Sequence, residues 1–284
     1  MGKILDKYLV NPLSASLVLH VNDFDEVAKA IMCVLESNLV GEIFLLDNSP
    51  SDKLKKLKKI NPKRINYVFI GNNIGFGRAH NVAIKKVTKS NYKYHLILNP
   101  DIEFKPGCLE LLYNFMENNV DCGVASPKIL NPGGELQTLC KKLPTIFELV
   151  GKQIPITWIQ KKVNAGLELH KFNYDQPLNT PWLSGCFMLF RVGSFNKVGM
   201  FDERFFMYME DIDLSRRFHK HYKTMFYPKA EIIHGHRSGW KSNKSLFIKL
   251  LVSTVKYFSK HGWLFDSDRV KINKEYKKRV NALS

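Results

Sequence analysis

The stretch that decides the fold is "SASLVLHVNDFDEVAKAIMCVLES", residues 14–37. Its first part, residues 14–21, is a short run rich in leucine and valine, which is typical of a strand buried on both faces. Asn22 and Asp23 follow as candidate helix caps, and residues 25–37 show helical spacing of apolar side chains. The stretch therefore predicts a strand, a polar corner and a helix.

Strand and helix signals keep alternating through the first hundred residues. Strands are predicted at "GEIFLLDNS" (41–49), "RINYVFIG" (64–71) and "YKYHLILNPD" (92–101), and helices at "SDKLKKLKKI" (51–60) and "GRAHNVAIKKVTKS" (77–90). This alternation predicts an α/β fold with a mostly parallel central sheet flanked by helices. Because ligands of such sheets bind at the carboxyl ends of the strands, the polar residues at the four strand ends should meet in one crevice.

Two of these strand ends carry an aspartate. Asp101, after the strand "LIL" and Asn99, could hold Mg²⁺ or Mn²⁺ against a diphosphate, since these cations prefer oxygen ligands. The alternative is that Asn-Pro-Asp is only a turn. Asp47 could accept a hydrogen bond from the N3–H of a uracil or thymine ring, and capping of a helix is the alternative.

The glycine-rich segment "GNNIGFGRAHNVAI" (71–84) resembles a phosphate loop only in part. Gly75 and Gly77 fit the start of G-x-G-x-x-G, but His80 occupies the third glycine position, so the dinucleotide fingerprint is rejected. What remains is a tight turn that opens a helix, with Arg78 near the positive end of that helix. This arrangement favours an anionic group, and a purely structural turn is the alternative.

Acidic residues gather in "MFDERFFMYMEDIDLSRRF" (200–218), although the formal net charge of the chain is +17. On a helix, Asp211 and Asp213 are about 200° apart. Asp213 can pair with an arginine three or four positions later, which leaves Asp211 or Glu210 on the opposite side, near aromatic residues. A carboxylate that loses solvation there becomes a better base. A solvated helix start is the alternative.

Other residues limit the class of protein. His234 and His236 in "IIHGHRSG" share one face of an extended chain, and could bind a cation or a diphosphate or be ordinary surface histidines. Five widely spaced cysteines without a CxxC pair predict free thiols. The sequence has neither an apolar run long enough to span a membrane nor a signal-peptide pattern. Its 43 basic and 26 acidic residues predict attraction to polyanions, whether nucleic acid, lipid headgroups or phosphorylated small molecules.

The second half of the chain is less regular. "NPGGELQ" (131–137) predicts a turn, and residues 142–166, with two prolines and poor periodicity, predict a mobile excursion. The tail from about residue 240 has helical spacing and, from Lys241 onward, eleven basic and three acidic residues, a charge of +8. One predicted helix face carries Phe247, Leu250, Leu251, Val255 and Phe258, and the opposite face Lys249, Lys256 and Lys260. Such a helix can lie on an anionic membrane or dock on the rest of the protein, and both remain open.

Six segments in order along the chain resemble the family 2 glycosyltransferases, in particular their bacterial rhamnosyltransferase-like branch. The segments are "LVLHVND" (17–23), "LLDNSPSD" (45–52), "NNIGFGRAHNVAI" (72–84), "LILNPDIEF" (96–104), "WLSGCFMLFR" (182–191) and "VGMFDERFFMYMEDIDLSRR" (198–217). The resemblance implies a GT-A nucleotide-diphospho-sugar transferase fold. The catalytic domain would cover residues 1–240, with a donor-binding half at 14–104 and an acceptor-side half at 105–240, followed by a basic amphipathic helical tail at 241–284.

The resemblance also implies roles for individual residues. Asp211 matches the catalytic base, with Glu210 beside it. Asp101 matches the aspartate near a divalent metal, Mg²⁺ or Mn²⁺, and His234 and His236 are further candidate ligands. The nucleotide-sugar-binding residues would be His20, Asn22, Asp47, Asn48, Asn72, Gly75, Phe76, Arg78, Asn81, Asn99, Trp182 and Gly185.

The function that follows is an inverting glycosyltransferase. The first expectation is transfer of L-rhamnose from dTDP-rhamnose to a growing surface polysaccharide or a polyprenyl-diphosphate-linked saccharide, and a UDP-hexose or UDP-N-acetylhexosamine donor is the alternative. The expected location is the cytoplasm, with attachment to the inner face of the membrane left open. A non-catalytic polyanion-binding protein is the alternative of another class. The aromatic residues cluster with apolar neighbours instead of alternating with lysine and arginine, so nucleic acid is not expected as a partner.

Overall fold

The computed structural model describes residues 11–153, 172–235 and 244–283. The strands are β1 (Leu13–Leu19), β2 (Val40–Asp47), β3 (Ile65–Phe69), β4 (Tyr94–Leu98), β5 (Ile102–Glu103), β6 (Cys122–Leu130), β7 (Leu178–Asn179), β8 (Phe187–Arg191) and β9 (Lys223–His234). The helices are α1 (Phe24–Leu35), η1 (Lys53–Ile60), α2 (Phe76–Val87), α3 (Cys108–Asn118), α4 (Ile146–Gln153), η2 (Val192–Ser194), α6 (Phe195–Val198), α7 (Glu210–His219), α9 (Lys244–His261) and α10 (Ser267–Leu283).

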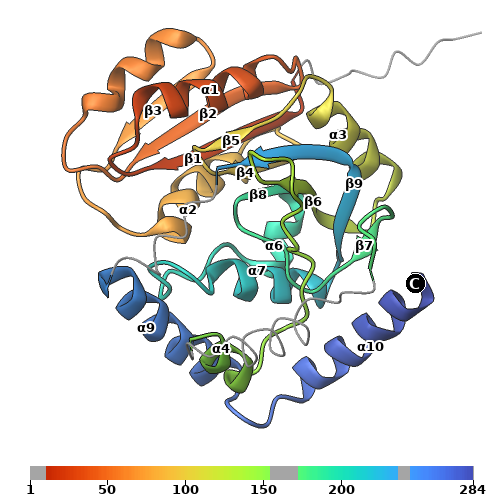
Figure 1. The fold of residues 1–284 in the computed structure, drawn as a ribbon. Helices are drawn as coiled ribbons and strands as arrows, with labels where there is room; N and C mark the ends of the chain where they lie inside the picture. The colour runs from red at the N-terminus through yellow and green to blue at the C-terminus, as the bar shows by residue number, and fades with distance from the viewer. Residues whose placement is uncertain (1–10, 154–171, 236–243, 284) are drawn as a thin grey trace, which may run out of the picture.

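One sheet of nine strands forms the centre of the protein, in the order β3-β2-β1-β4-β8-β6-β9-β5, with β7 paired to β9. Helices α1 and α3 cover one face of the sheet, and α2 and α7 cover the other (Figure 1). This three-layer arrangement confirms the predicted α/β fold with a central sheet flanked by helices.

The four strands of the first hundred residues are parallel, as predicted. In their register Leu19 pairs with Asp47, and Asp47 pairs with Phe69, so the carboxyl ends of β1, β2 and β3 are level. The other half of the sheet is mixed, because β8 runs antiparallel to both β4 and β6 while β6 and β9 are parallel. The strand ends that should meet in one crevice therefore lie at one edge of the sheet.

The opening stretch folds as its sequence predicts. Strand β1 is buried along almost its whole length, and the Asp23 side chain accepts hydrogen bonds from the backbone N–H groups of Asp25 and Glu26. A side-chain cap of this kind stabilises a helix by about 1 kcal/mol. The cap fixes where α1 begins, with four residues between the end of β1 and the helix.

Residues 51–60 differ from the prediction in the type of helix. Residues 53–60 form a 3₁₀ helix, and the Asp52 side chain makes no capping hydrogen bond within the described structure. Leu54 and Leu57 are its buried residues, three positions apart. A 3₁₀ helix has about three residues per turn, so this spacing places both leucines on one side, which an α-helix would do less well.

The middle of the chain is partly more regular than predicted. The turn at residues 131–137 is confirmed, since the Gly134 N–H donates to the Asn131 carbonyl at 2.8 Å. The prediction of a mobile excursion is wrong for residues 146–153, which form α4. A capping box begins this helix: the Thr145 N–H donates to Glu148 and the Glu148 N–H donates to Thr145 Oγ1. Residues 154–171 lie outside the described residues.

The tail is helical, as predicted, but its faces are not the predicted ones. On α9 the buried residues are Ser253, Thr254, Tyr257 and Phe258. Leu250 packs with them, whereas Leu251 and Val255 are exposed. The predicted apolar face is therefore divided between the protein interior and the outside.

The contacts of the α9 lysines explain why the predicted apolar face is only partly buried. The Lys256 ammonium donates to the Arg204 carbonyl at 2.7 Å, and Lys260 forms ion pairs with Asp202 and Asp213. These lysines, predicted on the helix face opposite the apolar one, contact the protein, because carboxylates and carbonyls of residues 202–213 bind them. Throughout the described ranges, every helix is too short or too polar to cross a bilayer.

Candidate active site

The loops that follow β1, β2 and β3 are joined by hydrogen bonds. His20 Nδ1 lies 3.2 Å from the Asn48 carbonyl oxygen, and the Val21 N–H donates to Ser49 Oγ at 2.9 Å. The Asn48 amide donates to the Gly75 carbonyl at 3.2 Å. The predicted meeting of polar strand ends is thus confirmed for these three loops.

Asp47 is fully buried at the end of β2. Its Oδ1 accepts a hydrogen bond from the Ser49 N–H at 2.9 Å, and its Oδ2 accepts one from the Tyr67 hydroxyl at 2.5 Å. Burial, followed by the hydrogen bond to Asp47, raises the pKa of the Tyr67 phenol, so Tyr67 stays a donor. A nucleobase would reach Asp47 only after its covering atoms move, and contact with the base stays a prediction.

The glycine turn before α2 is held against the segment that precedes α7. Gly75 has a φ of +95°, and a side chain there would come within 2.3 Å of the Phe206 carbonyl oxygen, so only glycine fits. The Phe76 N–H donates to that same carbonyl at 3.0 Å. Phe76 and Asp211 both lie close to Gly185, where an added Cβ would be 3.6 Å and 3.2 Å from their side chains.

Other predicted donor-site residues of this segment contact the protein itself. The Asn81 side chain is buried and bonds both the N–H and the carbonyl of Phe201, as well as Glu203. Arg78 is exposed and forms an ion pair with Glu203 at 3.4 Å. Asn72 is exposed in the preceding loop. Asn81 and Arg78 thus tie α2 to residues 201–203, and their contact with a donor stays a prediction.

A strained turn places two carboxylates at the start of α7. Tyr208 and Met209 have φ values of 68° and 66°, a left-handed conformation that costs roughly 1–3 kcal/mol per residue and is common at functional sites. Asp211 follows, and its carboxylate accepts hydrogen bonds from Trp182 Nε1 at 3.3 Å and from the Gly185 N–H at 3.2 Å. The Ile212 N–H donates a third, at 2.8 Å.

The two neighbouring carboxyl groups differ in their surroundings. Burial raises the pKa of both, and the charge of Asp211 raises that of Glu210 further. Hydrogen bonds from Trp182 and the backbone oppose the rise for Asp211, whereas Glu210 Oε2 has no hydrogen-bond partner among the described residues. The pKa of Glu210 is raised to about 8, so Glu210 is the more readily protonated of the two, and the hydrogen bonds favour the charged form of Asp211. This separation of pKa values is typical of acid–base sites.

Asp213 has the structural role that its spacing predicts. It forms ion pairs with Arg217 at 2.8 Å and Lys260 at 2.6 Å, and a hydrogen bond with His261 at 2.8 Å. Of the two candidate arginines, it is the one four positions later that binds it. Asp213 is therefore turned away from Asp211, as the helical spacing predicts.

The predicted metal ligands are partly brought together. Asp101 Oδ1 lies 3.5 Å from His234 Nε2, because β5 pairs with the end of β9. The Asn99 side-chain nitrogen is 3.3 Å from the same His234 atom, and Gln137 Oε1 is 3.2 Å from His234 Nδ1. His236 lies outside the described residues.

These side chains suit a cation whose remaining ligands come from the substrate. Asp101 and His234 offer one carboxylate and one imidazole. Within residues 11–153, 172–235 and 244–283, no three histidine, cysteine, aspartate or glutamate side chains gather as a metal site. Mg²⁺ takes about six ligands and often binds through one or two protein side chains plus phosphate oxygens. The residues fit a divalent metal that binds together with a diphosphate.

The loop before β8 connects the metal candidates to the catalytic candidates. The Asn99 N–H donates to the Cys186 carbonyl at 2.9 Å. Burial first, and then the charges of Asp101 and Asp211, raise the pKa of the Cys186 thiol to about 12, so both carboxylates lie near this residue. The structure therefore brings the ends of β2 and β4 and the start of α7 into one region, as predicted.

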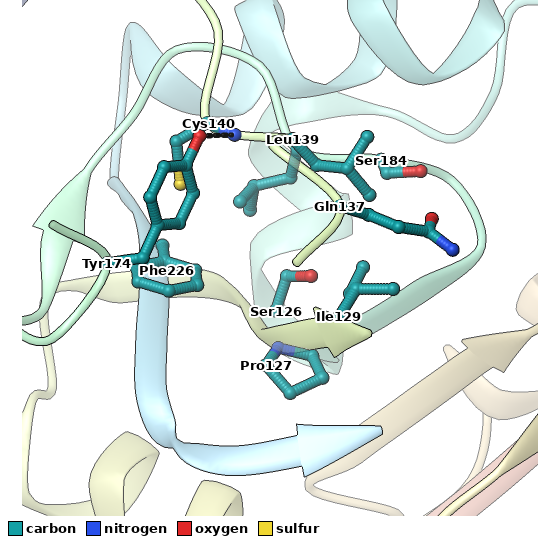
Figure 2. A pocket seen from close by; sticks show the side chains of 10 residues that line it. Ser126, Pro127, Ile129, Gln137, Leu139, Cys140, Tyr174, Ser184 and Phe226 are labelled. Carbon is teal, nitrogen blue, oxygen red and sulfur yellow. Dashed lines mark hydrogen bonds between the residues drawn. The ribbon is translucent and has the colours of Figure 1, made fainter. Parts of the chain in front are cut away.

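Two hollows lie outside this region. A void of about 10 Å³ is lined by Gln137 and Ser184 on one side and Tyr174 and Phe226 on the other (Figure 2). It is about the size of one water molecule, far too small for a sugar. A larger hollow of about 420 Å³, between α1, α3 and β9, is lined by Glu103 among others. Neither is lined by Asp47, Asp101 or Asp211.

Three polar residues that support the site were not identified from the sequence. They are Tyr67, which holds Asp47, Gln137, which holds His234, and Glu203, which holds Asn81. Tyr67 could have been found, because a tyrosine near the end of β3 lies next to β2 in a parallel sheet. Gln137 and Glu203 have no such signal, because their contacts join residues 97 and 122 positions apart.

Comparison with known proteins places the chain in a family. Residues 17–199 match the family model described as glycosyl transferase family 2. The chain is 27% identical to the N-acetylglucosaminyl-diphospho-decaprenol L-rhamnosyltransferase of Mycobacterium tuberculosis, over 68% of this chain and 66% of the relative, just under two thirds of its length. It is 28% identical to the rhamnosyltransferase WbbL of Escherichia coli, over 77% of this chain and 82% of the relative.

Solved structures show the same fold at low sequence identity. The crystal structure of GalNAc-T7 with UDP, GalNAc and Mn²⁺ has a TM-score of 0.63 at 16% identity, over 94% of this chain and 55% of that one. The Staphylococcus aureus TarS 1–349 structure has a TM-score of 0.57 at 14% identity, over 96% and 72%. The sheet and its helices thus have the GT-A fold, and with its family match over most of the length this chain belongs to glycosyl transferase family 2.

Proposed function

We propose that this protein is an inverting glycosyltransferase in which Asp211 accepts the proton of the acceptor hydroxyl. The observation that supports this most is the pair at the start of α7. Asp211 keeps its charge through three hydrogen bonds, and none of the described cationic side chains forms an ion pair with it. Glu210 beside it is buried and holds a proton. A charged carboxylate with a raised pKa is suited to take a proton near neutral pH.

The reaction follows from the positions of these residues. As Asp211 takes the hydroxyl proton, the hydroxyl oxygen forms a bond to the anomeric carbon of the donor sugar. The bond from that carbon to the diphosphate breaks on the opposite face, so the configuration inverts. Gly185 leaves space beside Asp211, and its N–H orients the carboxylate. Asp101 and His234 would hold Mg²⁺ or Mn²⁺, which, when bound, stabilises the charge of the departing nucleoside diphosphate.

The donor that we propose first is dTDP-L-rhamnose. Both relatives compared above are named as rhamnosyltransferases. A UDP-hexose, including an N-acetylhexosamine, is the alternative, because the chain is also 25% identical to a hexosyltransferase of Haloferax volcanii over 63% of this chain. In either case Asp47, held by Tyr67, would accept the N3–H of the pyrimidine ring, which uracil and thymine share. The remaining residues predicted at the strand ends would line the donor.

The acceptor that we propose is a saccharide linked to a polyprenyl diphosphate, or a growing surface polysaccharide. The name of the mycobacterial relative describes a lipid-linked N-acetylglucosamine. In this proposal, residues 1–240 are the catalytic domain and residues 241–284 are the tail. A non-catalytic polyanion-binding protein would not require Asp211 to be oriented, and the family membership argues against it.

A transfer assay with defined donors tests the proposal. The purified chain is incubated with Mn²⁺, a short-chain polyprenyl diphosphate carrying N-acetylglucosamine, and either dTDP-L-rhamnose or one of several UDP-hexoses. We expect product from dTDP-rhamnose, loss of product with a chelator, and an inverted anomeric configuration by NMR. Product with retained configuration would contradict the mechanism. Product from a UDP-hexose but not from dTDP-rhamnose would identify the UDP-hexose as the donor. No turnover with any nucleotide sugar would contradict the proposed function.

A further inference from the structure

Helix α9 has a second apolar face that points away from the protein. Its exposed apolar residues are Ile248, Leu251, Val252 and Val255, with exposed fractions of 44–60%. Their spacing of three and four positions places them on one side of the helix. The opposite side carries Ser253 and Tyr257, which are buried against the rest of the protein. The outward face is therefore a regular apolar stripe with no protein covering it among the described residues.

The loop between α9 and α10 also exposes large apolar side chains. Trp263 and Leu264 are 44% and 60% exposed, and Phe265 is 93% exposed. Large apolar side chains cost free energy when they face water, so a loop that shows three in a row is typical of a binding surface. We call the seven residues of the stripe and loop the outer apolar surface.

The helix that follows the loop carries exposed lysines. Helix α10 buries Arg269, Ile272, Tyr276 and Val280, whereas Lys271, Lys274, Lys277 and Lys278 are exposed. We call these four lysines the lysine row. Residues 244–283 contain ten lysines and arginines and three aspartates and glutamates, a net charge of +7. The segment that carries the outer apolar surface thus has a strongly positive net charge.

The inner sides of these helices are firmly attached, so the outer apolar surface has a fixed direction. Arg216 of α7 and Asp266 of the loop form a buried ion pair with two hydrogen bonds, at 2.6 and 2.7 Å. Ser253 Oγ donates to the Met207 carbonyl at 2.7 Å. Helices α9 and α10 run along the edge of the molecule opposite α1, joined by their loop at that edge (Figure 1).

We propose that the outer apolar surface and the lysine row bind the surface of an anionic lipid bilayer. Tryptophan, phenylalanine and leucine enter the boundary between headgroups and acyl chains, and lysines add attraction to anionic headgroups. A second copy of this chain is a poorer occupant, because pairing the same surfaces would bring two lysine rows of like charge together. Charge complementarity therefore selects the bilayer.

This docking would bring the catalytic candidates close to the membrane. Helix α9 packs on residues 204–207, where Lys249 lies 4.5 Å from the Phe206 ring and Lys256 binds the Arg204 carbonyl. The same segment leads directly to Glu210 and Asp211. If the acceptor is lipid-linked, as the proposed function states, the bilayer would deliver it beside the base. The docking itself does not depend on that function.

Vesicle flotation with the full chain tests the docking. Vesicles of phosphatidylcholine alone are compared with vesicles that contain phosphatidylglycerol. We expect recovery with the anionic vesicles, and at least about tenfold less for the double variant Leu264→Glu/Phe265→Glu, whose side chains are exposed. Val120→Glu is the matched control, because Val120 is 78% exposed and follows α3, far along the chain from the tail. It should float like the unaltered protein.

A second variant tests the role of charge. Lys274→Glu/Lys277→Glu should lower recovery with anionic vesicles several-fold, and high salt should remove most of the difference. Each variant is compared at equal thermal stability. Absence of the unaltered protein from anionic vesicles would overturn the proposal, and so would equal recovery of Leu264→Glu/Phe265→Glu. A dimer in solution that this variant dissociates, without vesicle binding, would also overturn it. Transfer to a water-soluble acceptor would be unaffected in every case, so failure here is distinct from failure of the proposed function.

Discussion

Three carboxyl groups in the first turn of helix α7 are in opposite electrostatic states. Burial raises the pKa of Glu210 and Asp211, and no cationic partner is found for either among the described residues. Asp213, two residues after Asp211, is also buried, but His261, Arg217 and Lys260 hold its pKa far below the usual range of an aspartate. Because burial is common to all three groups, the partners decide which carboxylate can exchange a proton.

The partners of Asp213 come mostly from elsewhere in the chain. Arg217 is on α7 itself, whereas Lys260 and His261 are at the end of α9. The tail thus helps to fix the helix that carries the candidate base. A candidate catalytic carboxylate and a stabilising one lie two positions apart, because their side chains face different neighbours.

The largest expected effect is on catalysis by Asp211→Asn. Loss of the base should lower kcat by about 10²–10⁴-fold, a typical range for general-base removal, while the affinity for a nucleotide stays within about twofold. Steady-state kinetics and a thermal shift with dTDP measure the two quantities. Asp121→Asn is the control, since Asp121 is an exposed partner of Lys223. Near-normal turnover of Asp211→Asn would show that the base is another group.

Asp213→Asn should show the opposite pattern. It leaves Arg217 and Lys260 without their buried partner, which costs about 3–5 kcal/mol of unfolding free energy, measured by urea denaturation. Because the folded pKa of Asp213 is lowered, its contribution is present above its unfolded pKa of about 3.8 and is lost as the pH falls below it. The difference from the unaltered protein should therefore shrink below about pH 4. A difference that is independent of pH would contradict the ion pairs.

Glu210→Gln should show a smaller effect with the opposite dependence on pH. The folded pKa of Glu210 is raised, so its contribution is present below its unfolded pKa of 4.5 and is lost as the pH rises towards the folded value. Between pH 5 and pH 8, the free energy of unfolding of Glu210→Gln should rise by about 1–2 kcal/mol relative to that of the unaltered protein. Thermal denaturation at both pH values measures this. An equal difference at the two pH values would mean that Glu210 does not hold a proton.

Tyr67→Phe should have the smallest effect. Asp47 is a third buried carboxylate, held by neutral donors, and it loses one of them in this variant. A hydrogen bond to a charged group that is lost from a buried site costs about 1–2 kcal/mol, so a pyrimidine nucleotide should bind about tenfold more weakly. Isothermal titration calorimetry with dTDP measures the affinity, and Tyr222→Phe is the control. Unchanged affinity would remove Tyr67 and Asp47 from the donor site.

Patterns within short stretches of the sequence predicted the parallel half of the sheet and the sheet edge at which the candidate site lies. Each strand there is a short apolar run followed by polar residues, and parallel pairing brings such ends to one edge. The capping box of α4 was also present in the sequence as Thr145 and Glu148, but the two prolines that flank the segment concealed it. No local pattern in the sequence indicates which face of α9 is buried. Its lysines turn inward because Asp202 and Asp213 bind one of them.

The sequence by itself determined the alternation of strands and helices, the polar strand ends and the pairing of Asp213 with an arginine three or four positions later, because these depend on spacing within one element. Only the tertiary structure decided that Gly185 and Trp182 orient Asp211, that His234 meets Asp101, and that the tail shows apolar residues outward. Each of these contacts joins elements far apart in the chain. Their side chains meet because the sheet order and the buried ion pairs bring them together, and no repeat length in the sequence encodes that.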